Sequence, residues 1–455
     1  MLNLDLGMTA LLRILGRFLG VLLLICLVVG TAAAEDLNYI RDAEIESTLR
    51  TYYTPILKVA GLEPTAVHIY LVNDPRLNSF VAGGQNIFVN TGTITRSETP
   101  NQLVGIVAHE TGHIAGGHLI RGEEAMRNAS IESIIAMVVG AGASVLGHNP
   151  GAGGAAVLSG ESVGIRSYLA FSVAQEATAD QAALSFLDKT HQSARGLLQF
   201  FQILEGQEIL SGALQSPYMR THPLTAQRIE YVKNHVAHSP YSDVPDPPDW
   251  VELHKRMKAK LVAFLSGPGQ TLQQYPETDN SIAARYARAV AFYRVPELKK
   301  ALVLIDGLIQ DEPKNPYFHE LKGQMLFENG KVRDAVAPYQ QSVRLAPDVA
   351  LLRVELAQVE IETNDPALNQ EALTHLKSAV SFEARNPDTW RFLAISYGRS
   401  GDMGNSALAL AEQAMASGDK PLARQQAQRA LKLLPAGSQG RLRAEDIQLE
   451  AQRKQ

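Results

Sequence analysis

The chain has 455 residues, of which 45% are hydrophobic and 20% charged, a balance typical of folded globular proteins rather than disordered ones. This length predicts about two or three domains. The formal net charge of −5 leaves no basic excess, so the composition argues against a nucleic-acid partner and gives no sign of acidic substrates.

The first 34 residues have the layout of a secretory signal peptide. Arg13 and Arg17 precede an apolar run over residues 18–29, and small residues follow up to Ala34, after which we expect cleavage. The run is shorter than the roughly 20 residues that span a bilayer, and an uncleaved anchor is the alternative. We therefore expect export, to the periplasm in a Gram-negative bacterium. The single cysteine, Cys26, lies in this segment, so a metal in the mature protein would be held by histidines and carboxylates.

Short strands and helices are predicted after the signal. Apolar residues at helical spacing predict a helix over 36–61, and a strand is expected over 67–72. Two further strands, at 80–81 and 86–90, flank a Gly-Gly turn, and a long helical pattern covers 99–127. The pattern predicts a mostly helical α+β domain with a small antiparallel sheet.

The next segment is apolar and then glycine-rich. Residues 134–146 are apolar without being long enough to span a membrane, and glycines are frequent over 147–154. A buried helix or a lid is the favoured interpretation, and a peripheral contact with the membrane is the other. Further helices are expected over 168–189, 192–210 and 224–237.

The C-terminal part carries an internal repeat. Counted from Gly323, Ala335, Tyr339 and Pro347 follow at 12, 16 and 24 residues, the offsets of the 34-residue tetratricopeptide pattern. About four such units are expected, each a helix pair that must stack on its neighbours. The predicted domains are a signal peptide (1–34), the α+β domain (35–238) whose motifs are described below, a Pro-rich linker and connecting helix (239–281), an all-α tetratricopeptide-repeat domain (282–437) and a charged tail (438–455).

The sequence His109-Glu110-Thr111-Gly112-His113 is an HExxH motif within the 99–127 helix. Residues four apart lie on the same face of a helix, so His109 and His113 can bind one Zn²⁺ together. Glu110 lies beside them, placed to take a proton from a zinc-activated water. Two histidines in so apolar a helix need a partner, because burying unpaired polar groups is costly.

A catalytic zinc ion usually has a third protein ligand and one open position. Metzincins supply that ligand from HExxHxxGxxH, but here Leu119 occupies the position and His118 lies one residue short, about 100° away on an ideal helix. We therefore expect a carboxylate from a later helix. Glu176 is the candidate ligand, and Asp180, one turn on, would accept a hydrogen bond from a ligand histidine.

These motifs resemble the HtpX and CAAX-endopeptidase family of gluzincin metallopeptidases. The resemblance rests on HETGH with His118, on Glu176-x-x-x-Asp180, on Thr221-His222-Pro223 and on the Asn78–Gly84 segment. With export and repeats, the chain is most similar to the BepA-like periplasmic proteases of that family. It departs from the family at Val173 and Thr178, where the family often carries Arg and Glu.

The resemblance implies that His222 lies near the zinc ion, where it either stabilises the oxyanion of the reaction or occupies the open zinc position. It implies that Arg228 anchors this loop through a carboxylate. We also expect an unfolded substrate to add as a strand along Asn86, Ile87, Phe88 and Val89, taken as an edge strand.

The expected function is that of an exported endopeptidase with one Zn²⁺ per subunit. It would degrade or process misfolded envelope proteins in outer-membrane assembly quality control, with the repeats binding the assembly machinery or its clients. The alternative is a repeat-based scaffold or chaperone whose zinc site is structural or latent.

Overall fold

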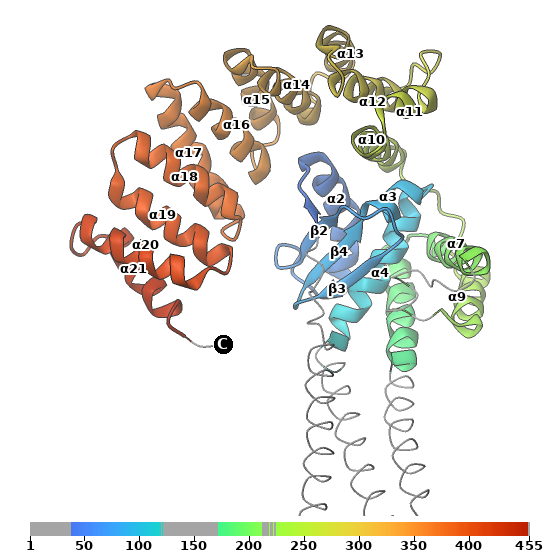
Figure 1. Ribbon diagram of the computed structural model, residues 1–455. Coiled ribbons are helices and arrows are strands. Elements are labelled where there is room, and N and C mark those ends of the chain that lie inside the picture. Colours follow the sequence, from blue (N-terminus) through green and yellow to red (C-terminus); the bar gives the residue numbers. More distant parts are fainter. Residues whose placement is uncertain are drawn as a thin grey trace, which may run out of the picture. The chain divides into compact units, whose positions relative to one another are not determined.

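The computed structural model describes residues 38–119, 121, 172–211, 218, 222 and 224–453 (Figure 1). The predicted signal peptide (1–34) and the apolar and glycine-rich segment (134–154) lie outside the described residues. Within the described part of the chain, no helix is long and apolar enough to cross a membrane.

The first helix, α2, spans Ala43–Val59, a shorter element than the predicted 36–61. It begins where it does because the Asp42 side chain accepts a hydrogen bond from the backbone N–H of Ile45 and so caps the first turn. Residues Tyr39–Ile40 before the cap form the short strand β1. After the helix, Gly61 adopts a φ of 76°, which favours glycine and ends the helical path.

Four strands form one sheet in the order β1-β2-β4-β3, with β2 at His68–Val72, β3 at Ser79–Ala82 and β4 at Asn86–Asn90. The β3–β4 hairpin turns through Gly83 and Gly84, whose φ angles of 58° and 96° suit residues without a Cβ. Strands β3 and β4 are antiparallel, whereas β2 and β4 are parallel. The mostly helical fold with a small sheet is confirmed, and the sheet is mixed where an antiparallel one was predicted.

Strand β4 lies inside the sheet. It pairs with β2 along one side and with β3 along the other. The predicted substrate strand, Asn86, Ile87, Phe88 and Val89, is thus wrong as an edge strand, because both sets of its main-chain groups face neighbouring strands. The strand at this end of the sheet is β3.

Helix α4, Pro100–Ala115, is buried along its length up to His113 and packs against α2, α7 (Arg195–Ser211) and β3. It is shorter than the predicted 99–127 helix, because the chain turns at Gly116 and Gly117 and helical structure resumes only at His118. Around it lie α3 (Thr91–Arg96), a helix whose described part covers 172–189, and α9 (Ala226–His238). This core fixes α4 against the elements that complete the site.

The rest of the described chain is helical. The predicted linker over 239–281 contains α10 and α11, and α10 contributes Met257 and Leu261 to the core around α4 and Ala259 and Ala263 to that of the following helices. The bounds are α10 Pro248–Leu265, α11 Pro268–Gln274, α12 Ile282–Tyr293, α13 Leu298–Asp311, α14 Pro316–Glu328, α15 Val332–Leu345, α16 Ala350–Glu362, α17 Pro366–Phe382, α18 Pro387–Arg399, α19 Met403–Ala416, α20 Lys420–Leu433 and α21 Gln439–Glu450.

Successive helices of this region pack on one another, as the repeat pattern predicts. Gly323 of α14 faces the ring of Tyr339 of α15, since a methyl group at Gly323 would lie 2.5 Å from that ring. This contact explains the small residue in the repeat pattern. Helix α21 lies within the predicted charged tail and buries Ala444 and Ile447.

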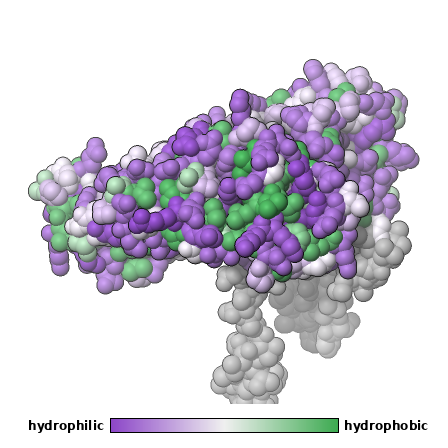
Figure 2. Space-filling model, turned by 90° about the horizontal axis from the view of Figure 1, so that it is seen from above, coloured by the Kyte–Doolittle hydropathy of each residue, from purple (hydrophilic) through white to green (hydrophobic). Residues whose placement is uncertain are grey.

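Apolar side chains are exposed at several places on the described part of the chain. Figure 2 shows mainly hydrophilic side chains on the face seen from above, with apolar ones between them. Large exposed apolar residues include Val303, Leu433, Leu442 and Leu449, on α13, α20 and α21. Scattered side chains of this kind are ordinary on protein surfaces.

Candidate metal centre

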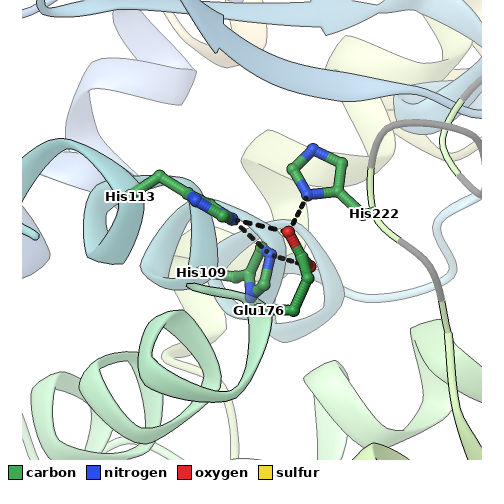
Figure 3. A group of neighbouring side chains, drawn as sticks. All are labelled: His109, His113, Glu176 and His222. Carbon is green, nitrogen blue, oxygen red and sulfur yellow. Dashed lines mark hydrogen bonds and ion pairs between the residues drawn. The ribbon is translucent and has the colours of Figure 1, made fainter. Parts of the chain in front are cut away.

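The two motif histidines come together because they lie one turn apart on α4. Their Nε2 atoms are 3.1 Å apart, and both rings are buried, His109 completely and His113 with 6% exposed (Figure 3). The rings meet edge to face, with 4.7 Å between centroids. The spacing of the motif thus produces the paired imidazoles that it predicts.

The helix over 172–189 places Glu176 opposite the histidines. Its carboxylate oxygens lie 3.3 Å from His109 Nε2 and 3.3 Å from His113 Nε2. The two helices approach this closely because Gly112 faces the backbone of the other helix, and a methyl group there would lie 2.8 Å from the carbonyl oxygen of Ala179. The glycine within the motif is therefore a packing requirement.

His222 completes the group from the turn before α9. Its Nδ1 lies 3.1 Å from Glu176 Oε1, and it stacks on Tyr218 with 4.6 Å between ring centroids. Potential ligand atoms of His109, His113, Glu176 and His222 all lie within 4.8 Å of one another. Four buried donors thus face one small volume.

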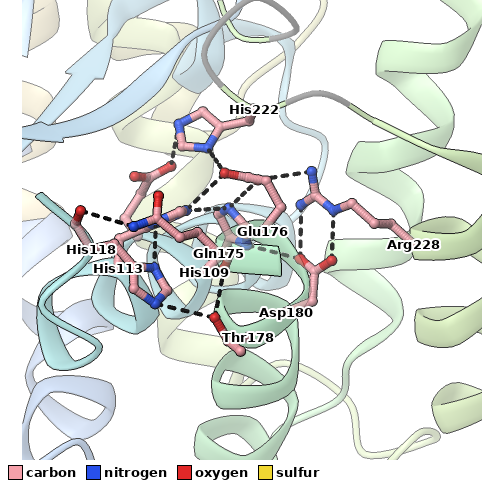
Figure 4. A network of polar contacts seen from close by, with 10 residues as sticks. His109, His113, His118, Gln175, Glu176, Thr178, Asp180, His222 and Arg228 are labelled. Atoms are coloured by element: carbon pink, nitrogen blue, oxygen red, sulfur yellow. Dashed lines mark hydrogen bonds and ion pairs between the residues drawn. The ribbon is translucent and has the colours of Figure 1, made fainter. Parts of the chain in front are cut away.

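Arg228 of α9 holds the two acids of the 172–189 helix. Its guanidinium donates to both oxygens of Asp180, at 2.7 and 2.9 Å, and lies 2.8 Å from Glu176 Oε2 (Figure 4). Its carbon Cζ lies 5.0 Å from the centre of the Phe201 ring. A bidentate pair of this kind fixes carboxylate orientation as well as charge.

The charges around the site favour ionised carboxylates. Burial opposes the ionisation of Glu176, but hydrogen bonds from the three surrounding histidines hold its pKa well below its usual range. Burial likewise opposes the charge of Asp180, and its bonds from Arg228 and His109 lower its pKa. A cation bound between the histidines and Glu176 would take the place of the protons that these hydrogen bonds require.

The histidines differ in their protonation. Burial lowers the pKa of His113 to about 3, so its ring is neutral. Burial also disfavours charge on His109, but hydrogen bonds to Asp180 and Glu176 outweigh it and raise the pKa to about 9. His109 Nδ1 lies 2.9 Å from Asp180 Oδ1, and Nε2 is the atom that faces the other candidate ligands.

The group fits a zinc ion by spacing and by donor type. Ligand atoms about 2.0–2.1 Å from a tetrahedral Zn²⁺ lie about 3.3 Å from one another. The nitrogen and oxygen atoms of His109, His113 and Glu176 are separated by 3.1, 3.3 and 3.3 Å. Two imidazole nitrogens and a carboxylate are the ligand set of a gluzincin-type centre.

Glu110 is the exceptional group of the site. It is completely buried, and neither carboxylate oxygen has a hydrogen-bond partner among the described residues. His222 Nε2 lies 3.7 Å from its Oε1. Burial raises the pKa of Glu110, although the nearby histidines oppose the shift. A buried carboxylate without hydrogen bonds carries a high cost unless function retains it.

Of the residues predicted from sequence, the structure brings together the motif residues, Glu176, Asp180, His222 and Arg228. The substrate strand, corrected above, belongs to the sheet. Sequence reasoning set His118 aside as a ligand and missed what it does: its Nδ1 lies 2.9 Å from His113 Nδ1. The feature of the sequence that could have indicated this contact is the pair Gly116-Gly117, which ends α4 and changes the direction of the chain.

Part of the chain matches a model of a known protein family. The description "Peptidase family M48" belongs to a family model that matches residues 40–236, a range that contains every residue of this centre.

Relatives extend the similarity beyond that range. The beta-barrel assembly-enhancing protease of Yersinia pestis is 23% identical over 392 residues, covering 83% of this chain and 77% of its own. The protein of the same name from Escherichia coli K12 is 22% identical over 363 residues, covering 78% and 72%. Metalloprotease LoiP of Escherichia coli K12 is 24% identical over 176 residues, covering 38% and 64%.

Among solved structures, the chain is similar to YrrB, described as a tetratricopeptide protein with an unusual peptide-binding site. The TM-score is 0.32 at 16% identity, and the similarity covers 40% of this chain and 91% of that one.

Proposed function

Since a model of peptidase family M48 matches residues 40–236, we propose that the protein is a zinc-dependent metalloendopeptidase in which His109, His113 and Glu176 hold the metal. The observation that carries the proposal is Glu110, a fully buried carboxylate without hydrogen bonds among the described residues, one position from a ligand. Such a group is explained if it serves a water molecule that reacts with substrate.

The chain's own residues then divide the work. When bound, zinc polarises the scissile carbonyl and makes a water acidic enough to react near neutral pH. Glu110 takes a proton from the attacking water and returns it to the amine nitrogen of the leaving peptide. Asp180 holds the tautomer of His109 through the 2.9 Å contact with Nδ1, and Arg228 keeps Asp180 in place.

The test is Glu110→Gln, which keeps the shape of the side chain and removes the base. We expect zinc content to remain that of wild type and hydrolysis of an unfolded protein to fall by about 10² to 10⁴-fold. Asp243→Asn is a matched control, because Asp243 is an exposed acid that pairs with Arg195 at 2.6 Å, away from the metal centre. Undiminished hydrolysis by Glu110→Gln would remove the base from the proposal.

His222 supports a regulated site. Its place within the ligand group favours the capping role, in which it occupies the open zinc position, over the oxyanion role. A cap predicts that His222→Ala raises proteolysis, whereas an oxyanion donor predicts a loss of about 10² to 10³-fold. An unchanged rate for the variant would exclude both.

Substrate binding is proposed along β3, since the interior strand β4 is unsuitable. The backbone N–H of Asn90 donates to the Asn78 carbonyl, so residues 78, 80 and 82 face β4 and Val81 directs its main-chain groups outward. A peptide paired there would require an unfolded backbone. Val81→Pro removes that N–H and should lower kcat/KM for unfolded substrates, with Val81→Thr as the control. A folded protein cleaved as fast as its unfolded form would contradict the proposal.

The biological setting is the most distant part of the proposal. The relatives named beta-barrel assembly-enhancing proteases and the predicted signal support export to the periplasm and a role in outer-membrane assembly quality control. The repeats would bind assembly components or clients. The position of His222 within the ligand group is the observation that supports the alternative function, a scaffold with a latent zinc site. Envelope function that survives Glu110→Gln intact would select the scaffold.

A further inference from the structure

The turn at the end of α4 brings a fourth histidine, His118, against His113 of the candidate metal centre. Gly116 ends the helix and Gly117 has a φ of 63°, so the chain reverses locally. The His118 ring then lies directly over Gly116, where a methyl group would be 2.4 Å from its Nε2. Only glycine at that position leaves room for the ring, and His118 is buried, with 6% exposed.

The hydrogen bonds of this ring favour one arrangement of protons. The Thr178 hydroxyl lies 2.9 Å from the Gln175 carbonyl oxygen, which can only accept, so the hydroxyl donates its single proton there. Towards His118 Nε2, at 3.1 Å, the same hydroxyl must accept. The neutral ring of His118 therefore carries its proton on Nε2 and presents a lone pair at Nδ1.

That lone pair determines the state of a proposed zinc ligand. His118 Nδ1 lies 2.9 Å from His113 Nδ1, so His113 donates through Nδ1 and keeps the lone pair of Nε2. This Nε2 is the atom that lies 3.3 Å from Glu176. Figure 4 shows the series from Thr178 through His118 to His113.

We infer that His118 is a positioning residue, an inference that rests on the proposed metal site. It fixes the tautomer and ring orientation of His113 as Asp180 does for His109, and it does so with a neutral acceptor. It also joins the two ligand helices, because Gln175 Nε2 donates to the His118 carbonyl oxygen at 3.0 Å, next to the ligand Glu176.

The inference predicts which substitutions weaken zinc binding. In the variant His118→Asn, the side-chain oxygen reproduces the acceptor at Nδ1, whereas His118→Leu has similar size and no acceptor. Chelator competition with Zn²⁺ alone should give His118→Leu a Kd about 10 to 100-fold weaker than wild type and His118→Asn a Kd within about threefold. The visible spectrum of the Co²⁺ forms should change for His118→Leu only. Equal Kd values for the two variants would overturn the inference.

A second pair of variants avoids the core. Thr178 is exposed, so Thr178→Val and Thr178→Ser should both fold. Serine keeps the hydroxyl and should bind Zn²⁺ as wild type does, and valine should bind several-fold more weakly. Equal affinities in this pair would also overturn the inference. Wild-type protein that binds no zinc would instead refute the proposed function, so the two failures are distinguishable.

Discussion

Gly112→Ala tests whether the approach of two helices sets the geometry of the metal centre. The added methyl group would lie 2.8 Å from the Ala179 carbonyl oxygen, which is 0.6 Å inside the 3.4 Å at which ordinary contacts begin. Glu176 lies on the same helix as Ala179, so relieving the clash shifts this ligand. A metal site tolerates changes in ligand distance of only about 0.2 Å.

The magnitude follows from two opposing terms. Alanine is favoured over glycine inside a helix by about 1 kcal/mol. Overpacking a core costs about 1 to 3 kcal/mol. We therefore expect a modest loss of stability, up to about 2 kcal/mol in the metal-free protein, together with zinc affinity weaker by at least about tenfold, because the displacement falls on the ligands.

Gly105→Ala is the matched control on the same helix. Its methyl group would lie 2.7 Å from the backbone nitrogen of Leu197, a clash of similar size directed at α7 instead of the ligand helix. Urea unfolding and chelator competition on both variants separate the two effects. The reasoning is refuted if Gly112→Ala and Gly105→Ala lose stability equally and also bind zinc equally well.

Three further perturbations test the network. Asp180→Asn should weaken zinc binding about 10 to 100-fold and lower the free energy of unfolding by about 3 kcal/mol, because the buried Arg228 loses the negative charge and one of the two carboxylate oxygens with which it pairs. A zinc affinity equal to that of wild type would contradict this. Burial lowers the pKa of His254 from 6.5 to about 4, so as the pH falls the unfolded chain binds a proton at this histidine before the folded chain does. Stability should fall between pH 6.5 and 4, by about 1.4 kcal/mol per pH unit, relative to His254→Gln, and parallel pH curves would exclude that role. Zinc at about 1,000-fold above its Kd should contribute about 4 kcal/mol to the free energy of unfolding, so a chelator should lower the Tm of wild type and of Glu110→Gln alike. A Tm that does not change with chelator would exclude a bound metal.

Local patterns in the sequence predicted the local parts of the site. The four-residue spacing of His109 and His113 placed both rings on one face of α4, and the Gly-Gly pair at 83–84 predicted the β3–β4 hairpin. These features depend on residues near one another in the chain, where periodicity and turn preferences act directly.

The errors concern partners that are distant in sequence. The apolar run within Asn86–Asn90 predicts a strand but carries no information on how many neighbours the strand has, so the parallel pairing with β2 was missed. Likewise, the helical geometry that set His118 aside assumed an unbroken helix over 99–127. The chain instead turns at Gly116 and Gly117, so the angular offset of His118 expected on an ideal helix does not apply.

The need for a third zinc ligand, and then the family resemblance, supplied what the local pattern lacked. Glu176 lies more than sixty residues from the motif, and no periodicity connects the two. The double contact of Arg228, to Asp180 and to Glu176, depends on how α9 packs beside the 172–189 helix, which only the folded chain reveals.

The central claim is that Glu110 acts as a base beside a metal held by His109, His113 and Glu176. The most direct measurement compares zinc content and hydrolysis of an unfolded protein for wild type, Glu110→Gln and Glu176→Gln at the same protein concentration. The account predicts one zinc ion per chain in wild type and Glu110→Gln, a strongly reduced content in Glu176→Gln, and hydrolysis by wild type alone. Full hydrolysis by Glu110→Gln, or full zinc content in Glu176→Gln, would contradict it.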